Sequence, residues 1–244
     1  MSDGVVVRVL SGRGSRAADR EALVALVADV TDTAATRVRV VRRCPHCGAA
    51  DHGRPAAVAD GHDLGVSLSR TTGVLALAVG PGPDMIGVDV ERPSRVAAAE
   101  LDAFTPGERE RAARSGSAAV HRTACWAVKE AVLKRDGRGL RVDPTEVDAV
   151  LDHGALDHGA LEHAAPHHGT SGPVRHTARL DGLVHPVTVL RLDEDLVLAV
   201  AADGAPVTVQ DRRETLVTDR RSLHRGVVLS PGERPRPSGG GVVR

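Results

Sequence analysis

The sequence predicts an α+β protein, and three observations lead to this fold class. Short Val-rich runs typical of strands occur near both ends of the chain, as at residues 5–10 and 196–202. The runs at 65–69 and 74–79 are separated by a four-residue turn, which favours an antiparallel hairpin. Residues 118–135 have the pattern of a long helix. Antiparallel strands combined with long helices define the α+β class.

The first half of the chain is predicted to contain four strands and one helix. After the strand at 5–10, residues 17–30 place alanine, leucine and valine at helical spacing. A Val-rich strand at 38–41 is followed by a predicted loop at 44–55. The hairpin at 65–79 supplies the last two strands of this half.

The second half begins after the Pro-Gly-Pro break at 81–83. Residues 86–90 are predicted to form its first strand. Asp89 and Glu91 are two positions apart, so on a strand they face the same side. Two carboxylates therefore project together from this strand.

Helices are predicted in the middle of the chain. Residues 92–103 and 106–114 have helical patterns, and the second begins with Thr105 as N-cap and Glu108 at the third position. This arrangement predicts a capping box. The long central helix is predicted to end near Gly137, because glycine suits the left-handed conformation that closes many helices.

Three further strands are predicted, at 174–180, 184–192 and 196–202. A His-rich repeat of the type Leu-Asp-His-Gly-Ala precedes them, and we expect residues 151–173 to form a mobile, solvated insertion. From 205 to 244 the chain has eight arginines against four acids and little apolar periodicity. This composition predicts a disordered basic tail.

The composition excludes several classes of function. With 244 residues, of which 41% are hydrophobic, the chain can bury a core. It contains one Phe, one Trp and no Tyr, so an aromatic platform for nucleic acid is excluded. Lys+Arg and Asp+Glu balance at 32 each, so no overall charge attracts nucleic acid or a membrane. Any anion site must therefore be local.

Nothing in the sequence predicts export or membrane insertion. There is no apolar run of about 18 residues, and no charged N-terminal segment leads into an apolar stretch. Three cysteines, an odd number, do not predict a disulfide framework. We therefore expect a cytoplasmic protein.

The tetrapeptide Cys44-Pro-His46-Cys47 copies a thiol oxidoreductase motif, but its predicted context is a loop outside a βαβ unit. Redox chemistry needs a thiolate at a helix N-terminus, so we disfavour this interpretation. A zinc site from these residues and His52 lacks a second Cys/His pair. Cys125 falls near the apolar side of its helix and is predicted to be a buried, inert thiol.

The only two lysines, Lys129 and Lys134, lie beside the only tryptophan, Trp126. On a helix Trp126, Glu130 and Lys134 fall within about 80° of each other, with Lys129 close by on the same side. In isolation a Glu130–Lys134 pair is usually a surface ion pair on an amphipathic helix.

Two carboxylates from a strand and one from a helix suggest a second interpretation. Mg²⁺ prefers oxygen ligands, keeps several waters and is often completed by substrate phosphates. Asp89, Glu91 and Glu130 could supply such ligands, and the neighbouring lysines would then face the phosphates. Acids on the solvent face of a strand remain the alternative.

Together these patterns resemble the 4′-phosphopantetheinyl transferases of the larger, two-lobed, surfactin-synthetase-activating kind. The resemblance spans residues 44–140 in the family's order. It rests on the segments Gly-Val-Asp-Val-Glu at 87–91, Trp126 to Lys134, Phe-Thr-Pro-Gly-Glu-Arg at 104–109, Ser-Leu-Ser-Arg at 67–70, and the Cys-Gly and Gly-Arg-Pro elements within 44–55, which are similar to actinobacterial members.

The resemblance implies a pseudo-dimer of two similar lobes, each a small antiparallel sheet with a long packed helix. The N-terminal lobe would span 1–84 and the C-terminal lobe 85–204. Coenzyme A and Mg²⁺ would lie in the cleft between them, and the protein would be a monomer. The implied reaction transfers 4′-phosphopantetheine from coenzyme A to a serine of an apo acyl or peptidyl carrier protein, releasing adenosine 3′,5′-bisphosphate.

The resemblance also implies roles for individual residues. Asp89, Glu91 and Glu130 would bind Mg²⁺, and Glu130 would take the proton from the attacking serine. Lys134 would stabilise or protonate the departing phosphate, and Lys129 would contact the same pyrophosphate. Asp89, Glu130 and Lys134 are therefore the expected catalytic residues.

Arg54, Ser69 and Arg70 are further candidates for contacts to coenzyme A. Arg70 departs from the family, which has histidine there; it stays cationic and can bind phosphate but is no proton acceptor near neutral pH. The N-terminal lobe is also short for the family, and Arg13, Arg16 and Arg20 are possible substitutes for its 3′-phosphate site. The alternative function is a catalytically impaired member that binds coenzyme A or a carrier protein.

Overall fold

The computed structural model describes residues 4–12, 14–44, 47–50, 53–83, 85–99, 101–151 and 175–213. All of them belong to one compact unit, Met1–Glu214. The predicted insertion at 151–173, apart from Leu151, and most of the predicted tail lie outside the described residues. Within the described ranges, no helix combines the length and the apolar character that crossing a membrane requires.

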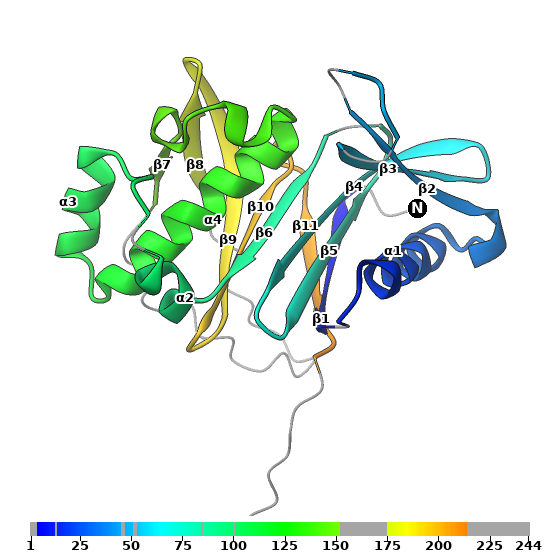
Figure 1. Cartoon of the computed structure of the whole chain (residues 1–244), viewed down its shortest axis with the longest axis horizontal. Helices are drawn as coiled ribbons and strands as arrows, with labels where there is room; N and C mark the ends of the chain where they lie inside the picture. Colours follow the sequence, from blue (N-terminus) through cyan, green and yellow to red (C-terminus); the bar gives the residue numbers. More distant parts are fainter. Residues whose placement is uncertain are drawn as a thin grey trace, which may run out of the picture. The chain divides into compact units, whose positions relative to one another are not determined.

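The first sheet has six strands in the order β11-β1-β5-β4-β3-β2. Its pairs are antiparallel except β1 and β11, which run parallel. Helix α1 (Arg16–Thr31), with Ser15 as N-cap, packs on this sheet (Figure 1). The strands are β1 (Val5–Ser11), β2 (Val38–Arg43), β3 (Arg54–Ala59), β4 (His62–Thr71), β5 (Val74–Gly80) and β11 (Val207–Asp211).

The second sheet has five antiparallel strands in the order β6-β10-β9-β8-β7. Helix α4 (Ala118–Asp136) packs on β6 and β10 of this sheet. Two shorter helices, α2 (Pro93–Ala98) and α3 (Pro106–Arg114), pack against α4. The strands are β6 (Gly87–Glu91), β7 (Asp148–Val150), β8 (Arg175–Leu180), β9 (Leu183–Asp193) and β10 (Leu196–Ala201); 3₁₀ turns occur at Ala35–Arg37, Gly139–Arg141 and Pro144–Glu146.

The two sheets repeat one topology. In the first, the order β1-α1-β2-β3-β4-β5 along the chain gives the spatial order β1-β5-β4-β3-β2. In the second, β6-α4-β7-β8-β9-β10 gives β6-β10-β9-β8-β7 in the same way. The predicted α+β fold of two similar parts, each an antiparallel sheet with a long helix, is therefore confirmed, and we call these parts the first and second lobes.

Three hydrophobic clusters hold the layers together. One packs α1 against the first sheet, with Leu23 and Leu26 fully buried. Another packs α4 against the second sheet. The third lies between the sheets, where Val7 of β1 meets Val88 of β6 and Leu198 of β10. Val, Leu and Ala dominate all three, as the composition predicts, and the layers run helix, sheet, sheet, helix (Figure 1).

Local signals in the sequence are largely confirmed. The Thr105 hydroxyl accepts a hydrogen bond from the Glu108 backbone N–H at 3.1 Å, and the Glu108 carboxylate accepts one from the Thr105 backbone N–H at 2.8 Å. The predicted capping box is therefore present. Helix α4 ends at Gly137, whose φ of 90° is accessible to glycine at little cost.

Three strands were not predicted from the sequence: β3 (Arg54–Ala59), β7 (Asp148–Val150) and β11 (Val207–Asp211). Residues 54 and 55 belong to β3 rather than to a loop, although Pro55 cannot donate to a ladder. Residues 207–211, predicted to belong to a disordered tail, form β11, in which Val207 pairs with Val5 of β1. This segment is too short for its own periodicity to show, and the edge of β1 supplies its hydrogen bonds. The prediction for residues 214–244 lies outside the described residues.

Gly87 allows α4 to lie directly against β6. A Cβ atom at this position would be 1.8 Å from the backbone oxygen of Ala131 and 2.9 Å from the backbone nitrogen of Arg135. Both atoms belong to the α4 backbone, so no side-chain rotation relieves the clash. The close approach sets the height of α4 above the strand that carries Asp89.

We expect Gly87→Ala to lower the free energy of unfolding by about 3 kcal/mol or more, because overpacking against backbone forces α4 away from β6. Chemical denaturation monitored by Trp126 fluorescence measures this change. The matched control is Gly107→Ala in α3, whose Cβ would meet only the flexible end of Arg111 at 3.1 Å. Equal stability of the two variants would contradict the close-packing role of Gly87.

Candidate active site

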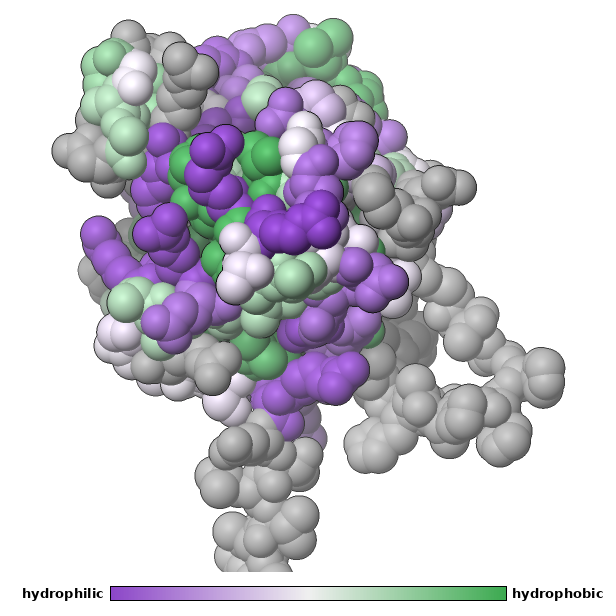
Figure 2. Space-filling model, turned by 90° about the vertical axis from the view of Figure 1, so that its right-hand side faces the viewer, coloured by the Kyte–Doolittle hydropathy of each residue, from purple (hydrophilic) through white to green (hydrophobic). Residues whose placement is uncertain are grey.

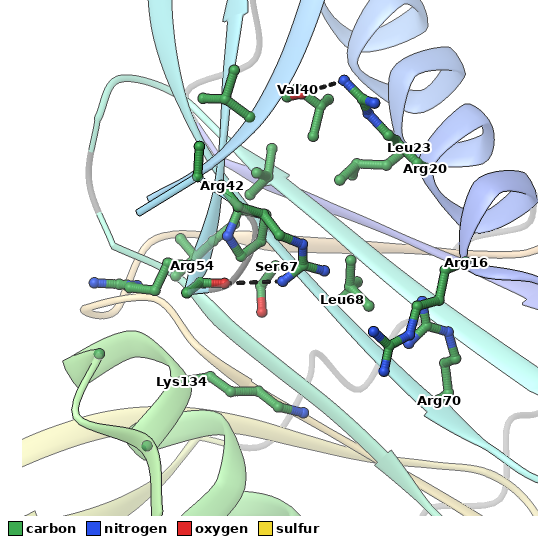
Figure 3. Close-up of a pocket in the computed structure, with 18 of the residues that line it drawn as sticks. Arg16, Arg20, Leu23, Val40, Arg42, Arg54, Ser67, Leu68, Arg70 and Lys134 are labelled. Atoms are coloured by element: carbon green, nitrogen blue, oxygen red, sulfur yellow. Dashed lines mark hydrogen bonds between the residues drawn. The ribbon is translucent and has the colours of Figure 1, made fainter. Parts of the chain in front are cut away.

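A pocket of about 910 Å³ opens where the first lobe meets α4 (Figure 3). Six cationic side chains line it, and none of the described lining residues is an Asp or Glu. The cations come from α1, β2, β3, β4 and α4: Arg16, Arg20, Arg42, Arg54, Arg70 and Lys134. A cleft with one sign of charge concentrates ligands of the opposite sign, so the pocket is suited to an anion.

The pocket also offers apolar surface, and no described lining residue is aromatic. The face of the molecule in Figure 2 likewise shows hydrophobic residues within a border of hydrophilic ones. An elongated ligand with apolar and phosphate parts would match such a lining. The larger apolar residues are Leu23, Val40, Val41, Val66, Leu68, Ile86 and Leu133.

Asp89 joins the two lobes beside the pocket. Its side chain is buried, with the residue 2% exposed. Oδ1 accepts hydrogen bonds from Ser69 Oγ at 2.7 Å and from Lys134 Nζ at 2.6 Å. Oδ2 is buried and has no hydrogen-bond partner among the described residues. A buried carboxylate oxygen without a partner is costly, so this atom is suited to bind a cation.

Hydroxyl groups on β4 hold β6 in place. Ser67 Oγ accepts a hydrogen bond from the backbone N–H of Val88 at 3.1 Å, on the outer edge of the second sheet. Ser69 binds Asp89, and Thr71 Oγ1 donates to Glu91 Oε2 at 3.3 Å. The three hydroxyls alternate along β4 and face the same side. They therefore fix both acidic residues of β6 relative to the first lobe.

The surroundings of Glu91 and Glu130 disfavour the ionised form of their carboxyl groups. Burial raises the pKa of both carboxyl groups, and the charge of Asp89 raises each pKa further. Lys134 opposes the shift at both positions. Asp89 therefore lies close enough to repel both Glu91 and Glu130.

A divalent cation would relieve this repulsion and satisfy Asp89 Oδ2, so the donor set fits Mg²⁺ chemically. Within the described ranges, however, no three His, Cys, Asp or Glu side chains are already arranged around a common metal position. Mg²⁺ often uses one or two carboxylates together with waters and substrate phosphates, and it does not need a complete protein cage.

Lys129 does not reach the pocket, and its predicted role in binding the pyrophosphate is corrected. The residue is 0% exposed and forms an ion pair with Glu108 Oε2 at 2.9 Å. Its ammonium also donates to the backbone oxygens of Pro144, at 2.8 Å, and Val147. Lys129 precedes Glu130 by about 100° around the helix, which is enough to turn it into the core.

Glu108 and Lys129 together connect three elements. Glu108 caps α3, pairs with Lys129 of α4, and accepts a hydrogen bond from the Ala149 backbone N–H of β7 at 2.7 Å. Both side chains are essentially inaccessible to water. Such a pair is strongly coupled to folding, because losing one partner leaves an uncompensated buried charge.

The structure confirms a place in the pocket lining for only some of the other residues predicted to contact coenzyme A. Ser69 does not line the pocket and instead orients Asp89, so its predicted direct contact is corrected. Arg54 and Arg70 do line the pocket. Arg54 Nη2 donates to the backbone oxygen of Arg135 at 2.7 Å, and burial lowers the pKa of its guanidinium. Arg70 forms an ion pair with Asp19 of α1.

The sequence predicted no role for two polar side chains that line the pocket, those of Arg42 and Ser67. Arg42 on β2 donates to the Gly53 backbone oxygen at 2.9 Å and projects into the pocket in Figure 3. Ser67 binds the edge of β6. Arg42 carried no local signal, because it is one of many arginines. Ser67 belongs to the segment at 67–70 that carries the resemblance, but its contact with β6 could not be predicted before the lobes are placed together. Arg16 and Arg20, considered as phosphate ligands, do line the pocket, and Arg13 lies outside the described residues.

The cysteines do not form the environment that redox chemistry needs. Cys44 follows β2 and is buried, whereas Cys47 is exposed in a turn closed by a Gly48 N–H to Cys44 oxygen hydrogen bond of 2.9 Å. Neither begins a helix. Burial, aided by the charge of Glu108, raises the pKa of Cys125 to about 12. The prediction that Cys125 is a buried, inert thiol therefore agrees with the structure.

Part of the chain is similar to known proteins. Residues 85–184 match the family model of the 4′-phosphopantetheinyl transferase superfamily. That segment contains β6 and α4, which carry Asp89, Glu91, Glu130 and Lys134.

Over 62 residues the chain is 48% identical to proteins named holo-[acyl-carrier-protein] synthase from Mycolicibacterium smegmatis (strain ATCC 700084 / mc(2)155) and from Mycobacterium sp. (strain KMS). The similarity covers 23% of this chain and 45% of each relative. The chain thus matches less than half the length of these curated relatives.

We expect Lys129→Ala to lower the free energy of unfolding by about 3–5 kcal/mol, because Glu108 would keep a buried charge without a partner. Denaturant unfolding measures the loss. The control is Arg114→Ala, which breaks an exposed ion pair with Glu110 on α3 and should change stability by less than about 0.5 kcal/mol. Unchanged stability of Lys129→Ala with weakened coenzyme A binding would restore the phosphate-contact role.

We expect Glu130→Gln to raise the melting temperature at pH 7 to 8. The raised pKa of Glu130 means that its ionised form is less favourable in the folded than in the unfolded protein, so removing the charge stabilises the fold. The gain should disappear below the ordinary pKa of 4.5, where the carboxyl is protonated in both states. Thermal melts across this pH range, with exposed Glu21→Gln as control, test the expectation. A lower melting temperature at neutral pH would contradict it.

Proposed function

We propose that this protein transfers the 4′-phosphopantetheine group of coenzyme A to a serine of an apo acyl or peptidyl carrier protein. The observation that carries the proposal is the placement of Lys134. Its ammonium lines the cationic pocket and also binds Asp89, which adjoins the other two carboxylates. Lys134 therefore connects the anion-binding pocket to the proposed metal ligands. The similarity to the transferase superfamily over residues 85–184 supports the same function.

The pocket suits coenzyme A as the donor substrate. The molecule carries a pyrophosphate, a separate phosphomonoester and a planar adenine whose faces pack on apolar surface. Lys134 would bind the pyrophosphate, while Arg16, Arg20 and Arg70 on the α1 side would bind the phosphomonoester. Adenine would rest on aliphatic side chains and guanidinium planes, because the described lining lacks aromatic rings.

Asp89, Glu91 and Glu130 would hold Mg²⁺ beside the pyrophosphate. Bound there, the ion would neutralise negative charge on the phosphate oxygens during transfer. The orphaned Oδ2 of Asp89 and the raised pKa values of Glu91 and Glu130 support this assignment. Ser69 would keep Asp89 oriented through its hydrogen bond to Oδ1.

The transfer itself needs a proton acceptor and a stabilised leaving group. The serine oxygen of the carrier forms a bond to the phosphorus that bears the pantetheine arm, and the bond from that phosphorus to the bridging oxygen breaks. Glu130, directly or through water, takes the serine proton; a carboxylate with a raised pKa is the better base for this task. Lys134 stabilises the negative charge that develops on adenosine 3′,5′-bisphosphate as it leaves.

The proposal extends to partners and setting. Carrier proteins are typically acidic, and the cationic side chains around the pocket would attract them. We further propose that the enzyme is a cytoplasmic monomer of the two-lobed, surfactin-synthetase-activating kind. The repeated β-α-β-β-β-β topology within one chain supports the two-lobed assignment.

We expect Lys134→Ala to lower turnover by about 100-fold or more while coenzyme A affinity changes less, because the lost charge acts mainly on the leaving group. The purified protein is incubated with coenzyme A, Mg²⁺ and an apo carrier protein, and the intact carrier is weighed over time. Arg122→Ala, an exposed cation on the same helix, serves as the control and should match the wild type.

The wild-type protein should add the mass of one phosphopantetheine group to the carrier, and Asp89→Ala should abolish the addition. If no carrier in a broad panel gains mass although coenzyme A binds, the transferase proposal fails. The protein would then be a binding member of the superfamily rather than an active one.

A further inference from the structure

A buried carboxylate, that of Asp19, contacts one of the cationic side chains that line the pocket. Asp19 lies in the first turns of α1 and is 3% exposed. Its neighbours Arg16 and Arg20 on the same helix line the pocket, but Asp19 does not. Acids are rarely buried without a partner, and here the partner is Arg70 of β4. The contact between this acid and the pocket lining is therefore made by Arg70.

The ion pair uses one specific atom of Arg70. Nε of the guanidinium donates to Asp19 Oδ2. The terminal nitrogens Nη1 and Nη2 make no hydrogen bond to any of the described residues. The side chain of Arg70 is 41% exposed and lines the pocket. The guanidinium is thus fixed at its inner edge, and its outer edge with two N–H-bearing nitrogens is available to a ligand.

The outer edge of Arg70 faces a region already rich in positive charge. Arg16 is three residues before Asp19 on α1, so their side chains lie on neighbouring positions of one helix face. In Figure 3 Arg16 and Arg70 project from the side of the pocket formed by α1 and β4, whereas Lys134 projects from α4. Two cationic regions therefore belong to one pocket and come from different lobes.

An arginine held in place binds a phosphate better than a mobile one. A guanidinium presents its N–H groups as a planar fork that matches two phosphate oxygens, but its long side chain loses rotamer freedom when it binds. Asp19 removes most of that freedom before a ligand arrives. The negative charge of Asp19 also repels a bound phosphate. Asp19 therefore raises the phosphate affinity by orienting Arg70 and lowers it by its charge, and replacing Asp19 by Asn removes the charge while keeping an oxygen acceptor.

We propose that Asp19 is a positioning residue, which holds Arg70 by Nε so that Nη1 and Nη2 bind a phosphomonoester. The inference rests on the proposed function, because the ligand it implies is the 3′-phosphate of coenzyme A. It also accounts for the arginine at position 70: an arginine, unlike a histidine, has an additional inner nitrogen for Asp19 and still keeps two outer ones. Asp19 itself touches neither the substrate nor the reacting atoms.

The test compares the full-length wild type with Asp19→Ala, Asp19→Asn, Arg70→Ala and the double variant Asp19→Ala/Arg70→Ala. Calorimetry measures the dissociation constants of coenzyme A and 3′-dephospho-coenzyme A, and carrier modification measures kcat and KM separately. Asp29→Ala is the matched control, since Asp29 lies on the same helix and pairs with Arg8 at 2.8 Å away from the pocket lining.

We expect Asp19→Ala to weaken coenzyme A binding about tenfold, the cost of immobilising one long side chain. KM should rise and kcat should stay the same. Binding of 3′-dephospho-coenzyme A should not change, and the double variant should be no weaker than Arg70→Ala. Asp19→Asn keeps an oxygen that accepts from Nε, so it should bind coenzyme A as well as the wild type or better.

Three results would overturn the inference: tighter coenzyme A binding by Asp19→Ala, an equal loss for both coenzymes, or a double variant weaker than Arg70→Ala by the full Asp19 effect. Failure of the transferase proposal gives a different pattern. A protein that shows the expected dissociation constants but modifies no carrier keeps the Asp19 role and loses the transferase function. A wild type that binds neither coenzyme contradicts both.

Discussion

The contact of Asp89 with Ser69 and Lys134 is the constraint on which the site depends. It joins β4 of the first lobe, β6 at the edge of the second sheet and α4 through one buried carboxylate. A buried charge is tolerated only with partners, so the carboxylate requires all three elements to be in register. Burial and the charge of this same carboxylate raise the pKa values of Glu91 and Glu130, so the electrostatic interactions of the site centre on the junction of the lobes.

The rest of the structure brings this contact into position. The absence of a side chain at Gly87 lets α4 approach β6 closely, so Glu130 and Lys134 lie over Asp89. The apolar cluster between the sheets holds the lobes together, and the buried Glu108–Lys129 pair anchors the other side of α4. One face of α4 is thus buried against the core and the adjacent face borders the pocket, and each face carries one of the two lysines.

The sequence predicted most of the fold because its signals were local. The capping box at Thr105, the hairpin of β4 and β5, and the glycine that ends α4 depend on near neighbours. Strand β11 was missed because only the edge of β1 makes it a strand. Lys129 was predicted to face the pocket because a helical wheel gives an angle but not the position of the core. Ser69 was predicted to contact coenzyme A because its hydrogen-bond partner, Asp89, lies on another strand and could not be inferred from the sequence.

A crystal structure of the protein with coenzyme A and Mg²⁺ would show whether Asp89 and Lys134 form the reaction centre. We expect the pyrophosphate against Lys134, a metal ion on Asp89 Oδ2, and the 3′-phosphate against the outer nitrogens of Arg70. Lys129 should remain paired with Glu108. Coenzyme A bound outside the pocket, or its pyrophosphate bound away from Lys134 and Asp89, would show that these residues do not form the reaction centre.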